Sequence, residues 1–235
     1  MSPWAVAVVC AVVGGVLGLF VPAGIALLPE PRGERPTEDG EKERYADLAR
    51  RPGLAPGSGL ASAVAAGAVG LHLGADRALW ALVPLVPVLV LLAIVDWRTR
   101  LLPRVVVLPA TGVAVALLLV EWIVVHETHV LLRAAIAGLV ARSFFWILWF
   151  VKRAGMGFGD VRLAALVGLV LGRLGWDEWL VGLYGGLLLF AVWGVGRAVV
   201  RHSRAALKQA LPYGPFLILG LGLGVLTSGT VSLFG

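Results

Sequence analysis

Eight apolar segments, separated by short polar turns, constrain this chain more than any other feature of its sequence. They lie at roughly 4–28, 58–75, 78–95, 105–125, 130–150, 162–175, 178–199 and 214–233. Of the 235 residues 59% are hydrophobic and only 14% are charged, whereas a soluble domain has about 25% charged residues. One aqueous core cannot bury that much apolar surface. The sequence therefore predicts an all-α fold, a polytopic membrane bundle of about eight transmembrane helices.

Two of these segments are weaker membrane spans than the rest. The segment 58–75 is rich in Ala and Gly, and 162–175 is short for a hydrocarbon layer about 30 Å thick. We expect each of them to be tilted, re-entrant or packed wholly inside the bundle.

Basic residues alternate between rich and poor turns along the chain, which predicts the orientation of the bundle. The rich turns contain Arg32, Arg35, Lys42, Arg44, Arg50 and Arg51; then Arg98, Arg100 and Arg104; then Lys152, Arg153 and Arg162; then Arg197, Arg201, Arg204 and Lys208. Such turns usually face the cytoplasm, so eight spans with both ends outside fit the pattern. The net charge of +6 is explained in the same way, and we expect no nucleic-acid partner.

Composition divides the chain into three parts. We predict a first transmembrane helix over residues 1–28, a polar cytoplasmic loop over 29–57 and a transmembrane core over 58–235. The first apolar run has no Lys or Arg before it, which favours a spanning helix over a cleaved signal peptide. The loop is dense in Pro, Glu and Arg, and we expect at most a short helix around "EKERYADLARR". Cys10, the one cysteine, lies in an apolar run, where we expect a core or lipid-facing side chain.

Two aspartates stand at the edges of apolar segments, where the alternation of basic turns puts both on the cytoplasmic side. Asp96 ends one segment in "LLAIVDWRTRLLP", and Asp160 precedes another in "GMGFGDVRLAAL". Each alone is explained equally well as an interfacial charge or a helix cap, and Asp160 resembles an N-cap. As a pair at one membrane level they favour a polar pocket, since a carboxylate at this boundary is costly unless paired or functional.

Two carboxylates that meet cannot both ionise freely, so the pair shares one proton. Such a pair can hydrolyse a peptide bond without a metal or cofactor. The ionised carboxylate takes a proton from water as general base, and the protonated one donates to the carbonyl oxygen and then to the leaving amine. The residue types alone do not say which aspartate holds the proton.

Three glycines precede Asp160. Gly157 and Gly159 have no side chain, so they let the backbone leave helical geometry and let a substrate strand approach closely. We expect a flexible, hydrated loop here, a conformation tolerated at membrane depth only beside protein or water. Gly155 is expected to end the preceding helix.

Three stretches resemble the type IV prepilin peptidases, a family of polytopic aspartic proteases. "GFGDVRL" is similar to the family's Gly-x-Gly-Asp-x-Lys-Leu signature, and "VDWRTRLLP" resembles its other catalytic motif, with Asp96 followed by Pro103. "LPYGPFLILG" resembles the stretch Pro-Phe-Gly-Pro-Phe-Leu-Ala-Leu-Gly before the last span. The three occur in the family's order and cover the chain from about 85 to 233.

The resemblance implies an activity and a set of site residues. Such enzymes remove the basic leader from type IV prepilins or pseudopilins at the cytoplasmic face of the inner membrane, after a Gly and before a hydrophobic residue. By this resemblance Asp96 and Asp160 are catalytic. The substrate-loop and positioning residues it implies are Gly157, Gly159, Arg162, Pro103, Pro212, Gly214 and Pro215. The implied partners are the prepilin and membrane lipid, with no cofactor and no metal.

The chain departs from the family pattern at three places. Arg162 replaces the signature Lys, and Tyr213 replaces a Phe of the third stretch. Many relatives carry two Cys-x-x-Cys pairs after the first span, in a zinc-binding insert associated with N-methylation of the pilin by S-adenosylmethionine. Residues 29–57 occupy that place without a cysteine, so we expect a peptidase without methyltransferase activity.

Other functions compete with this interpretation. A protease of the same Gly-x-Gly-Asp type that cuts within the membrane, a proton-coupled transporter using Asp96, Asp160 and Arg142, and a catalytically silent assembly protein each fit part of the sequence. Arg142 falls near the middle of a span, where we expect it to pair inside the bundle or line a wet cavity. "HETH", at 126–129, is expected to be a solvated turn and not a metal site.

Overall fold

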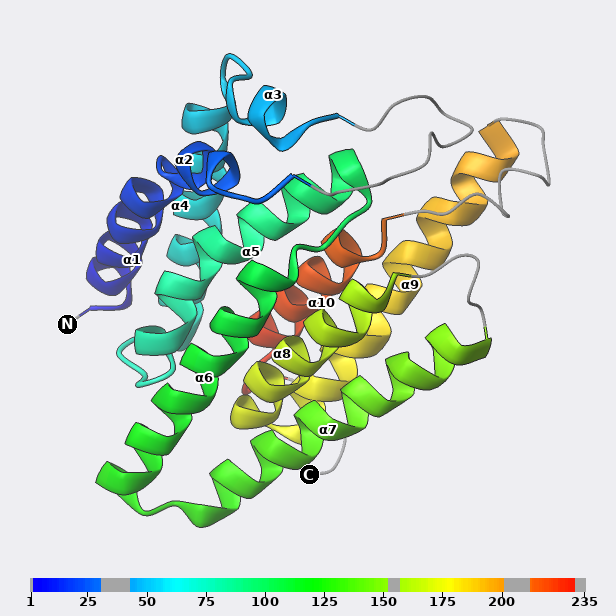
Figure 1. Ribbon diagram of the computed structural model, residues 1–235. Helices are drawn as coiled ribbons and strands as arrows, with labels where there is room; N and C mark the ends of the chain where they lie inside the picture. The colour runs from blue at the N-terminus through cyan, green and yellow to red at the C-terminus, as the bar shows by residue number, and fades with distance from the viewer. Residues whose placement is uncertain (1, 31–42, 152–156, 201–211, 231–235) are drawn as a thin grey trace. The chain divides into compact units, whose positions relative to one another are not determined.

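A computed structural model of the chain describes residues 2–30, 43–151, 157–200 and 212–230, and over these ranges it consists of helices without any strand (Figure 1). The helices are α1 (Pro3–Gly18), α2 (Val21–Ala26), α3 (Tyr45–Ala49), α4 (Leu54–Leu73), α5 (Leu79–Thr99), α6 (Arg104–Val125), α7 (Thr128–Val151), α8 (Phe158–Leu174), α9 (Trp176–Val200) and α10 (Gly214–Leu226). The prediction for Gly155 lies outside the described residues.

Six helical segments are long and apolar enough to cross a membrane. They are Pro3–Ala26, Leu54–Leu73, Leu79–Thr99, Arg104–Val125, Thr128–Val151 and Trp176–Val200. The two remaining predicted segments also form helices, α8 of 17 residues and α10 of 13. Many large apolar side chains on these helices face outward, as lipid contact requires. The predicted all-α, polytopic membrane bundle is confirmed.

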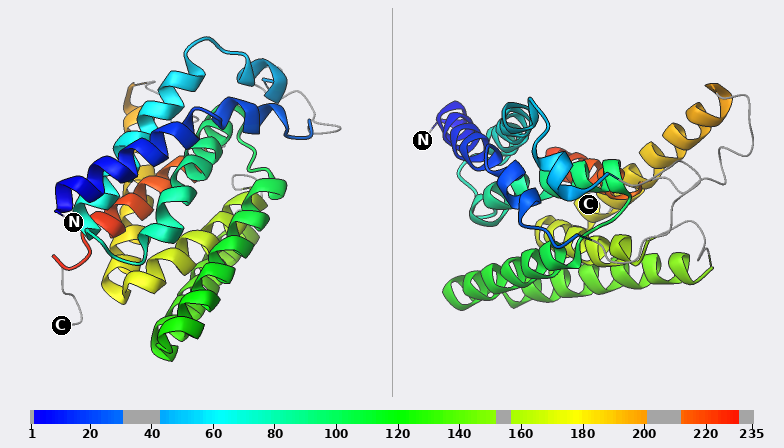
Figure 2. Two further views of the ribbon diagram at one scale, coloured as in Figure 1. Left: turned by 90° about the vertical axis from the view of Figure 1, so that its left-hand side faces the viewer. Right: turned by 45° about the horizontal axis from the view of Figure 1, so that its top comes forward.

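The chain divides into two compact units, residues 1–105 and 106–235, which are described separately below. In the first unit α1 packs along α4 (Figure 2). Small residues permit the close approach: a Cβ added to Gly18 would lie 2.6 Å from the Ser62 hydroxyl oxygen. That hydroxyl belongs to one of the small residues of α4 that face α1, the arrangement by which membrane helices bring their backbones together.

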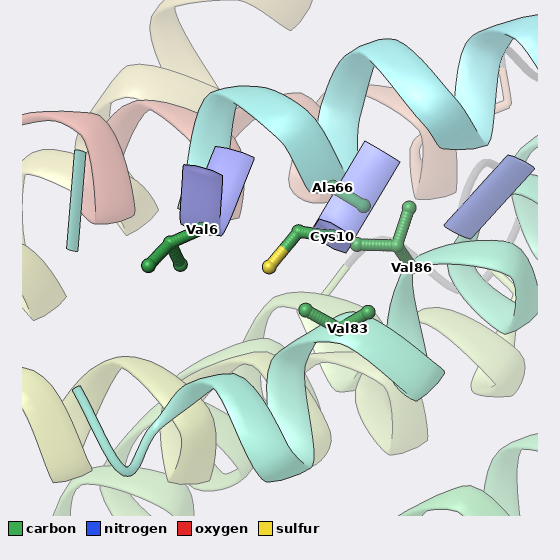
Figure 3. Close-up of a cluster of buried hydrophobic side chains, with 5 residues drawn as sticks. All are labelled: Val6, Cys10, Ala66, Val83 and Val86. Atoms are coloured by element: carbon green, nitrogen blue, oxygen red, sulfur yellow. The ribbon is translucent and has the colours of Figure 1, made fainter. Parts of the chain in front are cut away.

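A cluster of buried apolar side chains joins α1, α4 and α5 within this unit (Figure 3). Its members are Val6, Cys10, Ala66, Val83 and Val86. The prediction that Cys10 is a core or lipid-facing residue is confirmed, since it lies in the core.

Helix α5 carries two prolines, Pro84 and Pro87, in its first half. Proline has no N–H and its ring crowds the carbonyl four residues earlier. Two of the backbone hydrogen bonds of the helix are therefore missing there. The helix ends at Thr99, where Arg100 adopts a left-handed conformation with φ of 56°.

The polar segment before α4 contains the short helix that the sequence predicts. In α3, the Ala46 N–H donates to a carboxylate oxygen of Glu30 at 3.0 Å, and Arg51 Nε donates to Glu43 at 2.6 Å. Contrary to a fully solvated loop, the Tyr45 and Leu48 side chains are buried, because α3 lies against α2.

In the second unit α7 and α8 run side by side (Figures 1 and 2). Added Cβ atoms at Gly168 and Gly172 would collide with Ala141 and Ala137 of α7, so these glycines let the two backbones approach. Helices α9 and α10 meet in the same way through Gly182, Gly186 and Gly220.

Arginine side chains fix the far end of α8. The Arg133 guanidinium on α7 donates to the carbonyl oxygens of Gly172 and Arg173 at 2.7 Å each, and of Leu174 at 3.1 Å. These are carbonyls that the last turn of a helix leaves without a partner. Arg133 therefore caps α8, which accounts for one of the two arginines inside the fifth predicted span.

Candidate functional site

Asp160 is the third residue of α8, and Gly157 is the N-cap. The prediction of a flexible loop that carries Asp160 is therefore wrong, as is the prediction that Asp160 itself caps the helix. Gly159 is helical, and only Gly157 keeps an extended backbone, with φ of −76° and ψ of 145°. The Asp160 N–H donates to the Gly157 carbonyl at 3.1 Å.

The physical reason is the sign of the helix dipole. The amino end of a helix carries partial positive charge and unpaired N–H groups, so a carboxylate in the first turn stabilises it. The favourable position of Asp160 outweighs the cost of one glycine inside the first turn, which is about 1 kcal/mol. A Cβ added to Gly157 would lie 3.7 Å from Asp160 Oδ2, so the carboxylate folds back toward the start of the helix.

Asp160 is only 6% exposed, and the second unit brings Tyr213 close to it. Tyr213 precedes α10, and its ring packs on Phe145 of α7 at 5.2 Å and on Phe190 of α9 at 4.8 Å between centroids. Burial, and next the negative charge of Asp160, raise the pKa of the Tyr213 hydroxyl above its usual value. Two of the three resembling stretches, around 160 and around 213, thus meet in one buried site.

The residues around Tyr213 start α10. Pro212 and Gly214 are buried, and Pro215 occupies the first turn of the helix. A proline is tolerated there because the first N–H groups of a helix have no intrahelical acceptor. The Pro-Tyr-Gly-Pro sequence therefore places Tyr213 at the entry to α10.

Arg162 lies two residues after Asp160 and is half-buried. Its guanidinium carbon lies 4.8 Å from the centroid of the Phe158 ring, over its face, and the edge of Trp149 contacts the same ring at 5.2 Å between centroids. Stacking on an aromatic face is a property of arginine more than of lysine. The replacement of the signature lysine by Arg162 is therefore accompanied by an aromatic support.

Asp96 belongs to the first unit, in the last turn of α5, and is 4% exposed. The Arg100 N–H donates to the Asp96 carbonyl at 2.8 Å, and the Thr99 hydroxyl donates to the Val95 carbonyl at 2.8 Å. Pro103 is half-buried in the link from α5 to α6. The carboxyl end of a helix repels negative charge. A buried carboxylate in this turn therefore costs stability, which is tolerated where the acid has a function or where a nearby cation compensates its charge.

Two other candidates lie elsewhere. The Arg142 side chain is exposed on α7, so the prediction that it pairs inside the bundle is wrong. It is Arg133 that makes such contacts, with the carbonyls at the end of α8. Among the residues that the structure describes, no three His, Cys, Asp or Glu side chains come together in a way that could hold a metal ion. Of "HETH", His126 and Glu127 form the turn between α6 and α7, and Thr128 and His129 begin α7. Across this turn Trp122 Nε1 donates to the Thr128 hydroxyl at 3.1 Å.

Sequence reasoning missed Tyr213 as a member of the site. It appeared only as a departure from a phenylalanine of the family pattern, and phenylalanine has no polar atom. The signal in the sequence was the hydroxyl itself. A tyrosine between Pro212 and Gly214, directly before an apolar helix, places a polar group where burial is expected, and a buried hydroxyl needs a polar partner.

Known proteins resemble the chain as follows. Residues 83–195, which contain both Asp96 and Asp160, match the type IV leader peptidase family. A prepilin leader peptidase/N-methyltransferase of Burkholderia pseudomallei is 35% identical over 176 residues, covering 72% of this chain and 52% of that protein. Proteins of the same name are 32% identical in Pseudomonas putida over 161 residues (65% and 51%) and 26% identical in Bacillus subtilis over 180 residues (76% and 68%). No solved structure shows significant similarity to the chain.

The chain spans about half the length of the Burkholderia and Pseudomonas relatives. The region that matches the family, residues 83–195, includes both aspartates and the motifs around them. On this match and these identities, residues 83–195 of the chain form a domain of the type IV leader peptidase family.

Proposed function

We propose that this protein is an aspartic endopeptidase of the inner membrane that removes the leader from type IV prepilins or pseudopilins. The cut follows a Gly and precedes a hydrophobic residue, at the cytoplasmic face, and residues 58–235 form the peptidase core. The observation that carries the proposal is the buried carboxylate of Asp160 at the amino end of α8, inside the region that matches the leader peptidase family.

In this proposal Asp96 and Asp160 meet when substrate is bound and share one proton. Their places in the helices favour unequal roles. Asp160 lies at the positive end of α8 and Asp96 at the negative end of α5, and a helix stabilises a carboxylate only at its amino end. Asp160 is then the ionised general base that activates water, and Asp96 the protonated acid that donates to the carbonyl oxygen and the leaving amine.

The surrounding residues position the chain and its substrate. Gly157 leaves room for an extended peptide in front of Asp160, since its own backbone is extended and it carries no side chain. Arg162, held on Phe158, carries positive charge close to Asp160. Pro103 follows the helix that carries Asp96, and Pro212, Gly214 and Pro215 flank Tyr213 at the start of α10.

We propose peptidase activity alone for this chain. Its single cysteine, Cys10, is buried among apolar side chains of α1, α4 and α5, and the cysteine pairs that accompany methyl transfer in the resembling proteins have no counterpart in the sequence. Incubation of the protein with prepilin and S-adenosylmethionine is expected to yield a mature pilin with an unmodified amino terminus, measured by mass spectrometry.

Cleavage of a prepilin in membranes tests the proposal. The substrate is a type IV prepilin with a basic leader that ends in Gly before Phe, and the enzyme is wild type, Asp96→Asn or Asp160→Asn, produced in cells that lack other prepilin peptidases. Both asparagine variants keep the shape of the side chain, and both are expected to leave the leader attached. Glu127→Gln, in the turn between α6 and α7, is the matched control and is expected to cleave normally.

The products are read by gel mobility and by mass spectrometry of the new amino terminus. Circular dichroism and monodispersity in detergent establish that each variant is folded. Normal cleavage by either asparagine variant would refute the assignment of the pair, and no cleavage by the folded wild-type protein would refute the proposed substrate.

A further inference from the structure

We propose that the Tyr213 hydroxyl is a positioning group of the site, which donates a hydrogen bond to the Asp160 carboxylate when the site is ready for catalysis. The inference rests on the proposed function for its kinetic test, and on the geometry of the second unit for the rest. It adds to the pair of acids a third side chain, from a different helix, that touches neither the scissile bond nor the water.

The burial of this hydroxyl is the first observation. Tyr213 is 4% exposed, and within the described part of the chain its hydroxyl oxygen has no hydrogen-bond partner although it is fully enclosed. A buried polar group without a partner costs about 1–3 kcal/mol. Such a group in a native protein calls for an explanation, and a role in the site is one that its neighbours support.

The aromatic contacts determine which way the hydroxyl can move. Phe145 packs on the Tyr213 ring from α7 and Phe190 packs on it from α9, while Phe190 also contacts Phe216 in the first turns of α10 at 5.6 Å between centroids. The ring is thus packed between side chains of two helices, α7 and α9. Because these contacts hold the ring in place, the hydroxyl reaches an acceptor only by a small shift of the ring or of the acceptor.

Asp160 is the acceptor that the electrostatics indicate. Burial, and next the negative charge of Asp160, raise the pKa of the Tyr213 hydroxyl and so keep the phenol protonated. A protonated phenol is a hydrogen-bond donor at every physiological pH. A donor held beside a carboxylate gains most from the ionised form, because hydrogen bonds to a charged acceptor are the stronger ones.

Few other charged side chains surround these groups. Within about two turns of the contacting residues, α7 carries Arg142, α8 carries Arg162 and α9 carries Arg197. Arg142 is exposed, and Arg162 is stacked on Phe158. All three are permanently cationic, so a titration seen at Tyr213 between acid and neutral pH reports a carboxyl group and not one of these.

The kinetic test compares wild type with Tyr213→Phe, which keeps the ring and its two aromatic contacts and introduces the residue of the family pattern. A hydrogen bond to a carboxylate favours its ionised form. Its loss is therefore expected to move the acidic limb of the kcat/KM profile to higher pH by about one unit, so that cleavage falls about tenfold on that limb and stays near wild type on the plateau. Tyr184→Phe on α9, where the side chain is 61% exposed, is the matched control and leaves the profile unchanged.

A second measurement needs no cleavage. The chain has three tyrosines, so labelling with tyrosine carrying ¹³C at Cζ gives three resonances in detergent, and Tyr213→Phe identifies one of them. This resonance is expected to shift between acid and neutral pH in wild type and to lose that shift in Asp160→Asn.

The outcomes separate the two proposals. If the resonance follows Asp160 while the folded wild-type protein cleaves no prepilin, the inference stands and the proposed function fails. If cleavage is normal, but the resonance does not respond to Asp160→Asn, the inference is overturned. It is also overturned if Tyr213→Phe lowers kcat equally at every pH, since the hydroxyl would then act on the substrate and not on Asp160.

Discussion

Arg173 on α8 and Glu121 on α6 form a two-point ion pair, in which Nε donates to Oε2 at 2.8 Å and Nη2 donates to Oε1 at 2.7 Å. Both side chains are partly buried. A planar guanidinium facing a carboxylate in this way is stronger than a single contact. Within the second unit this pair links α6 to the helix that carries Asp160.

Replacement of Glu121 by Gln is therefore expected to weaken the attachment of α6. The substitution leaves Arg173 partly buried without its carboxylate, which costs about 1–3 kcal/mol. The measurement is the free energy of unfolding in detergent, or the midpoint of thermal unfolding. Glu127→Gln, in the following turn, should change neither, and equal stabilities of the two variants would contradict the importance of the pair.

The capping role of Arg133 predicts an effect that charge alone does not explain. Arg133→Lys keeps the positive charge but loses the fork that reaches the carbonyls of Gly172, Arg173 and Leu174, so we expect a loss of about 1–2 kcal/mol in the free energy of unfolding. Arg142→Lys, on the same helix with an exposed side chain, is the control and should be neutral. A neutral Arg133→Lys would show that the carbonyls are satisfied without the fork.

The seam between α7 and α8 should not tolerate even one methyl group. A Cβ at Gly172 would collide with Ala137 and approach the Arg133 carbonyl oxygen at 3.2 Å, so Gly172→Ala is expected to destabilise the protein by about 1–3 kcal/mol. Gly222→Ala is the opposite case, because nothing lies within 4 Å of its added Cβ. There alanine should be neutral, or stabilising by up to about 1 kcal/mol, since it is the better helix former.

Gly157→Ala separates the needs of the fold from those of the substrate. The backbone conformation of Gly157 is extended, so any residue can adopt it, and the added Cβ would make only an ordinary contact with Asp160. Stability should be unchanged, while prepilin cleavage should fall about tenfold or more if a substrate strand passes over this position. A folded variant that cleaves at the wild-type rate would mean that the strand approaches from elsewhere.

The sequence predicted the helices well because membrane spans follow from composition. Six of the eight predicted segments each lie on one helix with boundaries that differ by a few residues, as for the helix that begins at Leu54. The segment 4–28 is divided between α1 and α2, and the helix predicted over 214–233 ends at Leu226. An apolar run of this length has few alternatives to a helix, since a backbone in lipid must satisfy its own hydrogen bonds.

The start of α8 was predicted less well, for a physical reason. Gly157 and Gly159 flank Phe158, and two glycines so close together suggest irregular backbone. The structure places one of them at the N-cap and the other within the first turn. The electrostatic benefit of Asp160 at the helix start offsets the low helix propensity of the glycines. Propensities of single residues do not include this interaction.

The buried face of α3 was missed because short segments give little periodicity. Tyr45 and Leu48 are three residues apart and lie on one side of the helix, but two apolar residues within a charged stretch are too few to define a face. Their burial depends on α2, which is distant in sequence, and such tertiary contacts leave no local pattern.

The two prolines of α5 also affect how exactly Asp96 can be placed. Asp96 lies roughly 13 Å along the helix axis beyond Pro87, so a change of about 10° in the bend at the prolines displaces its carboxylate by about 2 Å. Because Pro84 and Pro87 have already removed two hydrogen bonds from the ladder, this change breaks no others. The carboxyl end of α5, where Asp96 lies, can therefore shift by about 2 Å through bending at the two prolines, without loss of further helical hydrogen bonds.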